Sequence, residues 1–175
     1  MSGIQFKTKL YQVGTYTILR LPKEVSAQLP SRGQTMVYAI INDYPLKTPL
    51  EPDGQFSHWL QIDQNISRKA HISSGDTVNV NIQPIDEWVE PDIPADLRQA
   101  LSAHPQADAL WQQITPLSRW EWIRWIRSTA NQTTRQKRIQ VACSKLTAGK
   151  RRPCCWNRNL CTEPSVSKSG ILVSV

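Results

Sequence analysis

The sequence lacks any long hydrophobic run. No apolar stretch among its 175 residues approaches the roughly 20 residues that a membrane-spanning helix needs. The opening residues, MSGIQFKTKL, lack the apolar core of a secretory signal. We therefore expect a cytoplasmic protein without a membrane span, whose cysteines are reduced thiols rather than disulfides.

Motifs that define common enzyme classes are also missing. The sequence contains no GxGxxG motif, no phosphate-binding loop ending in Gly-Lys-Ser/Thr, no HExxH zinc motif and no GxSxG nucleophile motif. Its three histidines, His58, His71 and His104, are scattered along the chain. We therefore expect no catalytic residues, no cofactor and no metal, and we favour a non-enzymatic role.

Acidic residues are scarce in the last third of the chain. Residues 119–160 contain eleven lysines and arginines but one acid, Glu121, whereas residues 1–118 carry nine basic and twelve acidic side chains. The net charge of +7 therefore resides mainly in the C-terminal part. This asymmetry is compatible with nucleic acid, phosphate or an acidic protein surface as partner, and equally with a solvated face that aids solubility.

The first half of the chain has the pattern of short β-strands. Residues 42–54, NDYPLKTPLEPDG, are turn-rich, and their prolines favour a loop or a sheet edge. Many short strands separated by turns favour a small β-barrel. Strands are predicted at residues 4–11, 15–22, 35–42, 56–62 and 77–85, and short helices at 22–29 and 64–70.

The second half predicts helices with clear boundaries. Thr115 suits an N-cap before Pro116, and Thr133 with Gln136 has the spacing of a capping box. Gly149 suits the residue just past a helix end. Helices are predicted over residues 94–104, 106–114, 115–130 and 133–148.

These patterns predict an α+β protein, with a small β-barrel followed by a helical bundle and an irregular tail. We expect domains at residues 1–90 and 91–150 and a tail at 151–175. Within the tail, residues 163–170 are expected to be loosely ordered, and residues 171–175 to add an edge strand or to fray.

A helical wheel of residues 117–130 separates two faces. Trp122, Ile123 and Ile126 share an apolar face, whereas Trp120 lies on the opposite side with two arginines. An indole between guanidinium groups can stack on a base, and it can equally pack against the core or the barrel. The predicted anion- or partner-binding residues are Trp120, Arg124, Arg127, Arg138, Lys145, Lys150, Arg151 and Arg152.

The stretch GKRRPCCWNRNLCTEP contains Cys154, Cys155 and Cys161 among four positive charges. Zinc sites prefer two residues between cysteines, because adjacent side chains tend to diverge, and the stretch has no histidine. A disulfide to Cys161, or thiolates stabilised by neighbouring arginines, are further alternatives. The favoured interpretation is that these thiols pack the tail, as Cys143 packs its helix.

The order of several segments resembles the YdeI/OmpD-associated family, the bacteriocin-protection proteins, over about residues 5–152. In that family a small barrel domain of unknown function precedes the helices, and no reaction is established. The resemblance implies that the predicted α+β fold contains a double-split-like β-barrel. His71 stands where, in that family, a glycine often precedes the turn that contains Gly75 and Asp76. The segments are LPKEV, TMVYAIINDYPLKTPLEPDG, ISRKAHISSGDTVNVNI, IPADLRQAL, TPLSRWEWIRWIRSTANQTTRQKRI and LTAGKRRP.

The resemblance implies a role in stress or bacteriocin resistance. We therefore expect a non-enzymatic binding protein whose partner, an unknown protein or a polyanion, contacts the basic C-terminal part. The alternatives are a nucleic-acid-binding protein that uses the same residues and a thiol-based redox protein that uses Cys154 or Cys155.

Overall fold

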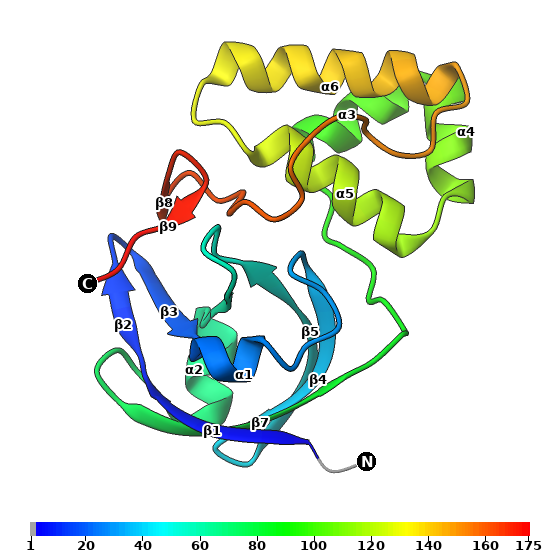
Figure 1. Cartoon of the computed structure of the whole chain (residues 1–175). Coiled ribbons are helices and arrows are strands. Elements are labelled where there is room, and N and C mark those ends of the chain that lie inside the picture. The colour runs from blue at the N-terminus through cyan, green and yellow to red at the C-terminus, as the bar shows by residue number, and fades with distance from the viewer. Residues whose placement is uncertain (1–2) are drawn as a thin grey trace. The chain divides into compact units, whose positions relative to one another are not determined.

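A computed structural model describes residues 3–175, which fall into two compact units (Figure 1). The barrel unit comprises the described residues up to Trp88 together with Arg158–Cys161 and Ser165–Val175. The helical unit comprises Val89–Asn157 and Thr162–Pro164. The residues after position 157 therefore alternate between the two units.

The barrel unit is built on one antiparallel sheet with the strand order β1-β7-β4-β5-β6-β3-β2. The first and last strands in this order are separated in sequence by Leu10 alone, so the sheet curls around its core (Figure 1). The predicted α+β class with an N-terminal barrel-like sheet is confirmed. The strands are β1 (Ile4–Lys9), β2 (Tyr11–Val13), β3 (Tyr16–Arg20), β4 (Thr35–Ile41), β5 (Tyr44–Pro52), β6 (His58–Gln61) and β7 (Thr77–Pro84).

Alternation of side chains along the strands fills the barrel core. On β7, Val78, Val80 and Ile82 are buried, whereas the alternating residues Thr77 and Asn79 are exposed. Because strand side chains alternate between faces, one set points inward throughout. The same apolar cluster includes Leu19, Val37, Ala39, Ile41, Leu50 and Leu60 from neighbouring strands.

The turn-rich segment after β4 forms a full strand, β5, so of the two predicted alternatives it follows the sheet edge rather than the loop. Its Tyr44–Leu50 stretch pairs with β4, and among the described residues it pairs with β6 only at Glu51 and Pro52. Much of β5 thus lacks a second neighbour, which is where a strand tolerates prolines such as Pro45 and Pro49.

Two short helices connect the strands, α1 (Lys23–Ser26) and α2 (Gln64–Ala70). The Asp63 side chain caps α2 by accepting a hydrogen bond from Ile66 N at 2.8 Å. His71 ends α2 in a left-handed conformation with φ of 56°. Such a conformation favours glycine, so a residue with a side chain is strained at this position.

The helical unit contains α3 (Ala95–Ala103), α4 (Pro105–Gln113), α5 (Pro116–Arg127) and α6 (Gln132–Thr147). Thr115 caps α5 as predicted, and its side chain accepts from Ser118 N at 3.2 Å. The predicted capping box at Thr133 is wrong, because Asn131 caps α6 and accepts from Thr134 N at 3.0 Å. In residues 3–175 no helix has both the length and the apolar character to cross a membrane.

The C-terminal end of α6 is closed by two backbone hydrogen bonds. Gly149, with φ of 89°, donates to Leu146 O at 3.0 Å, and Lys150 donates to Lys145 O at 2.9 Å. This is the Schellman arrangement, in which a left-handed residue satisfies the last carbonyl groups of a helix. The predicted helix end at Gly149 is confirmed.

The last residues form a hairpin of β8 (Ser167–Lys168) and β9 (Ile171–Leu172) that packs on the barrel. Leu172 N donates to Asp53 O at 2.8 Å, and Val166 and Leu172 are buried in one cluster with Ile18 and Trp59. The expectation of a loosely ordered segment is therefore wrong. Apolar burial, which the irregular sequence pattern did not reveal, holds the hairpin in place.

Candidate functional site

Arg124, one of the eight predicted binding residues, is buried in the helical unit. Its side chain belongs to α5, is 2% exposed, and its Cζ lies 5.0 Å from the centroid of the Trp156 ring. The expected exposed position of Arg124 is therefore wrong. A wheel considers one helix alone and cannot anticipate that an indole more than thirty residues later stacks on the guanidinium.

Three more of the predicted residues are half-buried and bonded within the same unit. The Trp120 indole Nε1 donates to Val89 O at 2.8 Å, and Arg127 Nε donates to Thr162 Oγ1 at 3.2 Å. Arg138 Nη1 donates to Trp125 O at 2.8 Å, and Arg138 Cζ lies 5.6 Å from the centroid of the Trp125 ring. These contacts orient the side chains along the surface of the unit.

The remaining four residues, Lys145, Lys150, Arg151 and Arg152, form what we call the basic end surface. They lie at the C-terminal end of α6 and directly after it, and the last three are exposed. Cations are favoured there because the helix dipole places partial negative charge at this end. The Trp122 indole Nε1 donates to Arg151 O at 2.9 Å and fixes the backbone between these side chains.

Arg152 is held by a bidentate ion pair with Glu121, the one acid in the basic region. Arg152 Nε donates to Glu121 Oε2 at 2.8 Å, and Arg152 Nη2 pairs with Oε1. Glu121 is buried, whereas the side chain of Arg152 remains 51% exposed. The pair raises the pKa of Arg152 and keeps its guanidinium in a defined place at the surface.

The adjacent cysteines Cys154 and Cys155 are exposed thiols, whereas Cys143 and Cys161 are buried. The side-chain hydrogen bond to Cys154 and that neighbour's charge raise the pKa of Cys155, while Lys145 acts in the opposite direction. This direction is contrary to that of a thiolate stabilised by arginines. Burial likewise raises the pKa of Cys143.

The four thiols occupy different surroundings. Cys161 belongs to the cluster that seats the hairpin on the barrel, and Cys143 to the core of the helical unit. None of the four is in a disulfide. Across residues 3–175 there is no group of three or more histidine, cysteine or acidic side chains placed to hold a metal ion.

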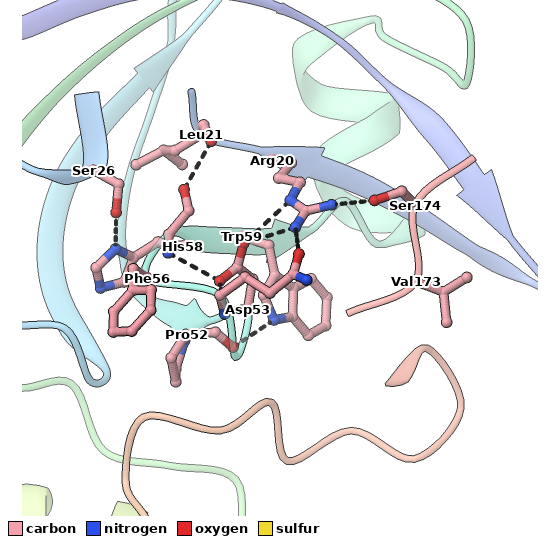
Figure 2. Close-up of polar contacts among 12 residues, drawn as sticks. Arg20, Leu21, Ser26, Pro52, Asp53, Phe56, His58, Trp59, Val173 and Ser174 are labelled. Carbon is pink, nitrogen blue, oxygen red and sulfur yellow. Dashed lines mark hydrogen bonds and ion pairs between the residues drawn. The ribbon is translucent and has the colours of Figure 1, made fainter. Parts of the chain in front are cut away.

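Sequence reasoning missed a polar cluster in the barrel unit, where Arg20 lies between Asp53 and Ser174 (Figure 2). Arg20 Nη2 donates to Asp53 Oδ2 at 2.8 Å and Nη1 donates to Ser174 Oγ at 2.6 Å. Although burial acts to raise it, the pKa of Asp53 is lowered by hydrogen bonds from Gln55 N and Ser57 N and by Arg20. The cluster ties the loop after β5 to the last residues of the chain.

A second missed feature is a buried serine–histidine pair, drawn on the opposite side of Figure 2. His58 Nε2 lies 2.8 Å from Gly33 O, which can only accept, so Nδ1 is left to accept from Ser26 Oγ at 2.5 Å. Burial lowers the pKa of His58 despite the hydrogen bond to Gly33. Both side chains have 0% exposure, so the pair has the composition of a nucleophile and base without access for a substrate.

One local signal pointed to this region. DGQFSH, residues 53–58, combines an acid and a glycine before a strand, and Asp53 Oδ1 accepts from Gln55 N at 2.7 Å and from Ser57 N at 2.9 Å. This is the turn that an aspartate readily organises. The partners Arg20, Ser26 and Ser174 come from distant parts of the sequence and left no local signal.

The geometry defines an α+β protein in which a curled antiparallel sheet precedes a helical unit with a basic end surface. Residues 6–82 match the family model described as Domain of unknown function (DUF1905), and residues 90–149 match OmdA, described as Bacteriocin-protection, YdeI or OmpD-Associated. The C-terminal part of the chain is thus similar to the YdeI/OmpD-associated family, and the N-terminal part to a domain of unknown function. A search of curated proteins finds no match to the chain. The family match indicates a function of the bacteriocin-protection type.

Proposed function

We propose that this chain is a non-enzymatic binding protein of the bacteriocin-protection type, and that an acidic partner contacts its basic end surface. The observation that carries the proposal is the exposure of Lys150, Arg151 and Arg152 directly after α6. Clustered cations of this kind raise the rate and affinity of binding to a surface of opposite charge.

The arrangement of the basic end surface supports binding without large reorganisation. Gly149 fixes the end of α6, the Trp122 indole holds the Arg151 carbonyl, and Glu121 holds the Arg152 guanidinium. Cations that are already oriented lose less conformational entropy when a partner binds. A partner that presents carboxylates suits the exposed guanidinium of Arg151, since both groups are planar, whereas two nitrogens of Arg152 are already paired with Glu121.

An acidic protein surface is favoured over nucleic acid by the surroundings of the tryptophans. Base stacking needs an accessible indole face beside the cations. Trp120 is half-buried and bonded to Val89 O, and Arg124 beneath Trp156 is withdrawn from the surface. Stacking on nucleobases therefore finds little support in this unit.

The burial of the Ser26–His58 pair supports a non-enzymatic role. A nucleophile and a base need access to the reacting atoms of a substrate. Both groups have 0% exposure, and their hydrogen bonds to each other and to Gly33 explain their presence as satisfied polar groups in a core.

The experiment compares charge reversal at two places. Binding of a fluorescent polyglutamate peptide and of a DNA duplex is measured by anisotropy for the wild type, for Lys150→Glu with Arg151→Glu, and for the control Lys23→Glu with Lys69→Glu on the barrel. We expect the peptide to bind the wild type and the control, and to bind the first variant at least about tenfold more weakly. Equal binding by all three proteins contradicts the proposed surface.

The DNA measurement decides between the two kinds of partner. Neutralisation of about four phosphates would reduce DNA affinity by roughly 100-fold between 50 and 200 mM salt. Stronger binding of DNA than of the peptide, with this salt dependence and with loss in the Lys150→Glu, Arg151→Glu variant, would overturn the acidic-protein assignment in favour of nucleic acid.

A cellular assay tests the family-level role. A bacterial strain that expresses the chain is challenged with a bacteriocin, and survival is compared with that of the empty vector. We expect protection by the wild type and by Lys23→Glu with Lys69→Glu, and loss of protection by Lys150→Glu with Arg151→Glu. Protection that is unchanged in the latter variant would contradict the role of the basic end surface.

A further inference from the structure

An open cavity of about 660 Å³ lies on the barrel sheet, where β1, β7 and the end of β4 are neighbours (Figure 1). Its volume is within the range of about 300–1,000 Å³ that is usual for small-molecule sites. The cavity belongs to the barrel unit, whereas the basic end surface belongs to the helical unit. Its polar lining, which gives it the name amide cavity, consists of Gln5, Lys7, Asn42, Thr77, Asn79 and Asn81.

The strand register places the amide side chains of this cavity next to one another. Gln5 on β1 is paired with Asn81 on β7, and Lys7 is paired with Asn79. Residues paired in this way have Cβ atoms about 4.5–5.5 Å apart, and residues two apart along a strand share one face of the sheet. These side chains therefore form a compact polar array on one face of two hydrogen-bonded strands.

The polar groups of the array are available to a ligand. The side chains of Gln5, Asn79 and Asn81 make no hydrogen bond to any residue that the structure describes. Asn42 is oriented by its backbone neighbour, because its Oδ1 accepts from Asn79 N at 2.8 Å. Its Nδ2 group, which carries two N–H donors, is left for other partners. A ligand can thus use these amides without breaking an internal hydrogen bond.

Gly3 restricts the position of the Asn81 amide. A Cβ added at residue 3 would lie 1.8 Å from Asn81 Oδ1, so the backbone of Gly3 lies directly against this side chain. Asn81 is accordingly half-buried although it lies on the polar face of β7. An amide that is already confined loses less conformational entropy when it binds a ligand.

The chemistry of the lining favours a neutral ligand that is rich in hydroxyl groups. Lys7 and Asp43 carry the charges of the lining, and these charges cancel. A phosphate or carboxylate ligand would instead favour several cations. Each amide offers a donor and an acceptor together, which matches a hydroxyl group that both donates and accepts. Phe6, Ile40 and Val80 add apolar surface for the C–H groups of a sugar ring.

We propose that the amide cavity binds a neutral oligosaccharide, with Gln5, Asn79 and Asn81 as its principal contacts. Their amides bind neighbouring hydroxyl groups of the sugar, while Lys7 and Asn42 donate further hydrogen bonds. The binding is non-covalent. Each hydrogen bond to the sugar replaces one to water and contributes little net free energy, so the expected dissociation constant is about 0.1–5 mM. This site is additional to the basic end surface and does not depend on the partner proposed for it.

The experiment is a nuclear magnetic resonance titration of the ¹⁵N-labelled full-length chain. The neutral probes are maltotriose, cellotriose and chitotriose, and trigalacturonic acid is the acidic probe. We expect at least one neutral trisaccharide to shift the backbone amide signals of β1 and β7 around the cavity in a saturable way. The affinity should not change between about 50 and 300 mM salt, because the ligand carries no charge.

Alanine substitutions test the contacts. Asn79→Ala and Asn81→Ala should each weaken binding about tenfold, and their folds should be intact because neither side chain bonds to a described residue. Gly3→Ala leaves every amide in place but displaces that of Asn81, and should weaken binding about threefold. The matched control is Asn65→Ala, which removes an exposed amide from α2 and should bind like the wild type.

The outcomes separate this site from the basic end surface. Lys150→Glu with Arg151→Glu should bind the trisaccharide like the wild type, whatever its effect on acidic partners. The proposal is overturned if no neutral trisaccharide binds, if trigalacturonic acid binds more tightly than the neutral probes, or if Asn79→Ala and Asn81→Ala bind as tightly as the wild type. Dispersion of the amide signals checks that each variant is folded.

Discussion

At the scale of single residues, the surroundings decide which chemistry a side chain can perform. His58 accepts from Ser26 and donates to Gly33 O inside the barrel, where burial keeps the imidazole neutral. Cys155 has the same type of reactive group as Cys143, yet one thiol is exposed and the other is buried. Residue identity alone does not separate these cases.

Protonation of His58 should make the barrel sensitive to mild acid. Its pKa in the folded chain lies below the ordinary value of 6.5, so the unfolded chain binds the proton first as the pH falls. The stabilisation is complete above pH 6.5 and is lost below it, by up to about 1.4 kcal/mol per pH unit. Urea unfolding between pH 7.5 and 5 measures this slope.

The variant His58→Gln separates this effect from the carboxylates. Asp53 and Asp96 have a lowered pKa, from an ordinary value of 3.8, so their stabilisation is lost only in stronger acid. We expect His58→Gln to be less stable at neutral pH but to lack the slope between pH 6.5 and 5. A wild-type stability that stays constant over this interval is incompatible with a buried neutral histidine.

His71 should be a position where glycine is better. Its φ of 56° places a Cβ in a crowded left-handed conformation at the end of α2. His71→Gly should raise the free energy of unfolding by about 1 kcal/mol, measured by chemical denaturation. His71→Ala is the control and should give no such gain, because alanine keeps the Cβ; stabilisation by both would point to loss of the imidazole instead.

At the scale of elements, the C-terminal hairpin is the least expected part of the fold. It has two short strands, but Leu172 is 2% exposed and packs with Ile18 and Trp59, whereas Ile171 is 38% exposed. Neighbouring residues of similar size therefore contribute very differently to stability. The hairpin is held by burial and by the hydrogen bond from Leu172 N to Asp53 O.

This contrast gives a matched pair of substitutions. Leu172→Ala should reduce the free energy of unfolding of the chain by about 2–5 kcal/mol, because it removes a buried side chain and leaves a cavity. Ile171→Ala should cost less than about 0.5 kcal/mol, as expected for a surface position. Chemical denaturation of both proteins measures the two changes. Equal losses in the free energy of unfolding would show that burial of Leu172 does not hold the hairpin on the barrel.

Local signals predicted many element boundaries. Thr115, Pro116 and Gly149 define helix ends through hydrogen bonds within a few residues, so the sequence carries that information. The burial of Arg124 and the packing of the C-terminal hairpin depend on partners far along the chain. Periodicity within a short window contains no record of such partners, which is why these features were missed.

At the scale of the whole molecule, the two family matches do not contain a complete barrel. The match to the domain of unknown function ends at residue 82, whereas the barrel unit also contains Arg158–Cys161 and Ser165–Val175. These late residues bury Cys161, Val166 and Leu172 against the sheet. The end of the match at residue 82 is therefore not the end of the barrel unit, because later residues also contribute to its core.

A fragment tests this conclusion. Residues 1–90 alone should be less stable than the barrel unit within the full chain, with about 3–6 kcal/mol lost through the absence of Val166 and Leu172. A peptide of residues 158–175 should raise the melting temperature of the fragment, and the same peptide with Leu172→Ala should not. A fragment as stable as the intact barrel unit, by differential scanning calorimetry, would contradict this view.

The alternation of the late residues between the two units has a consequence for biosynthesis. On a ribosome the first ninety residues emerge early, but the hydrophobic surface around Ile18 and Trp59 stays uncovered until residues 158–175 have left the exit tunnel. During that interval the nascent chain exposes hydrophobic surface that chaperones can recognise. The barrel unit therefore begins to be synthesised before the helical unit but is completed after it.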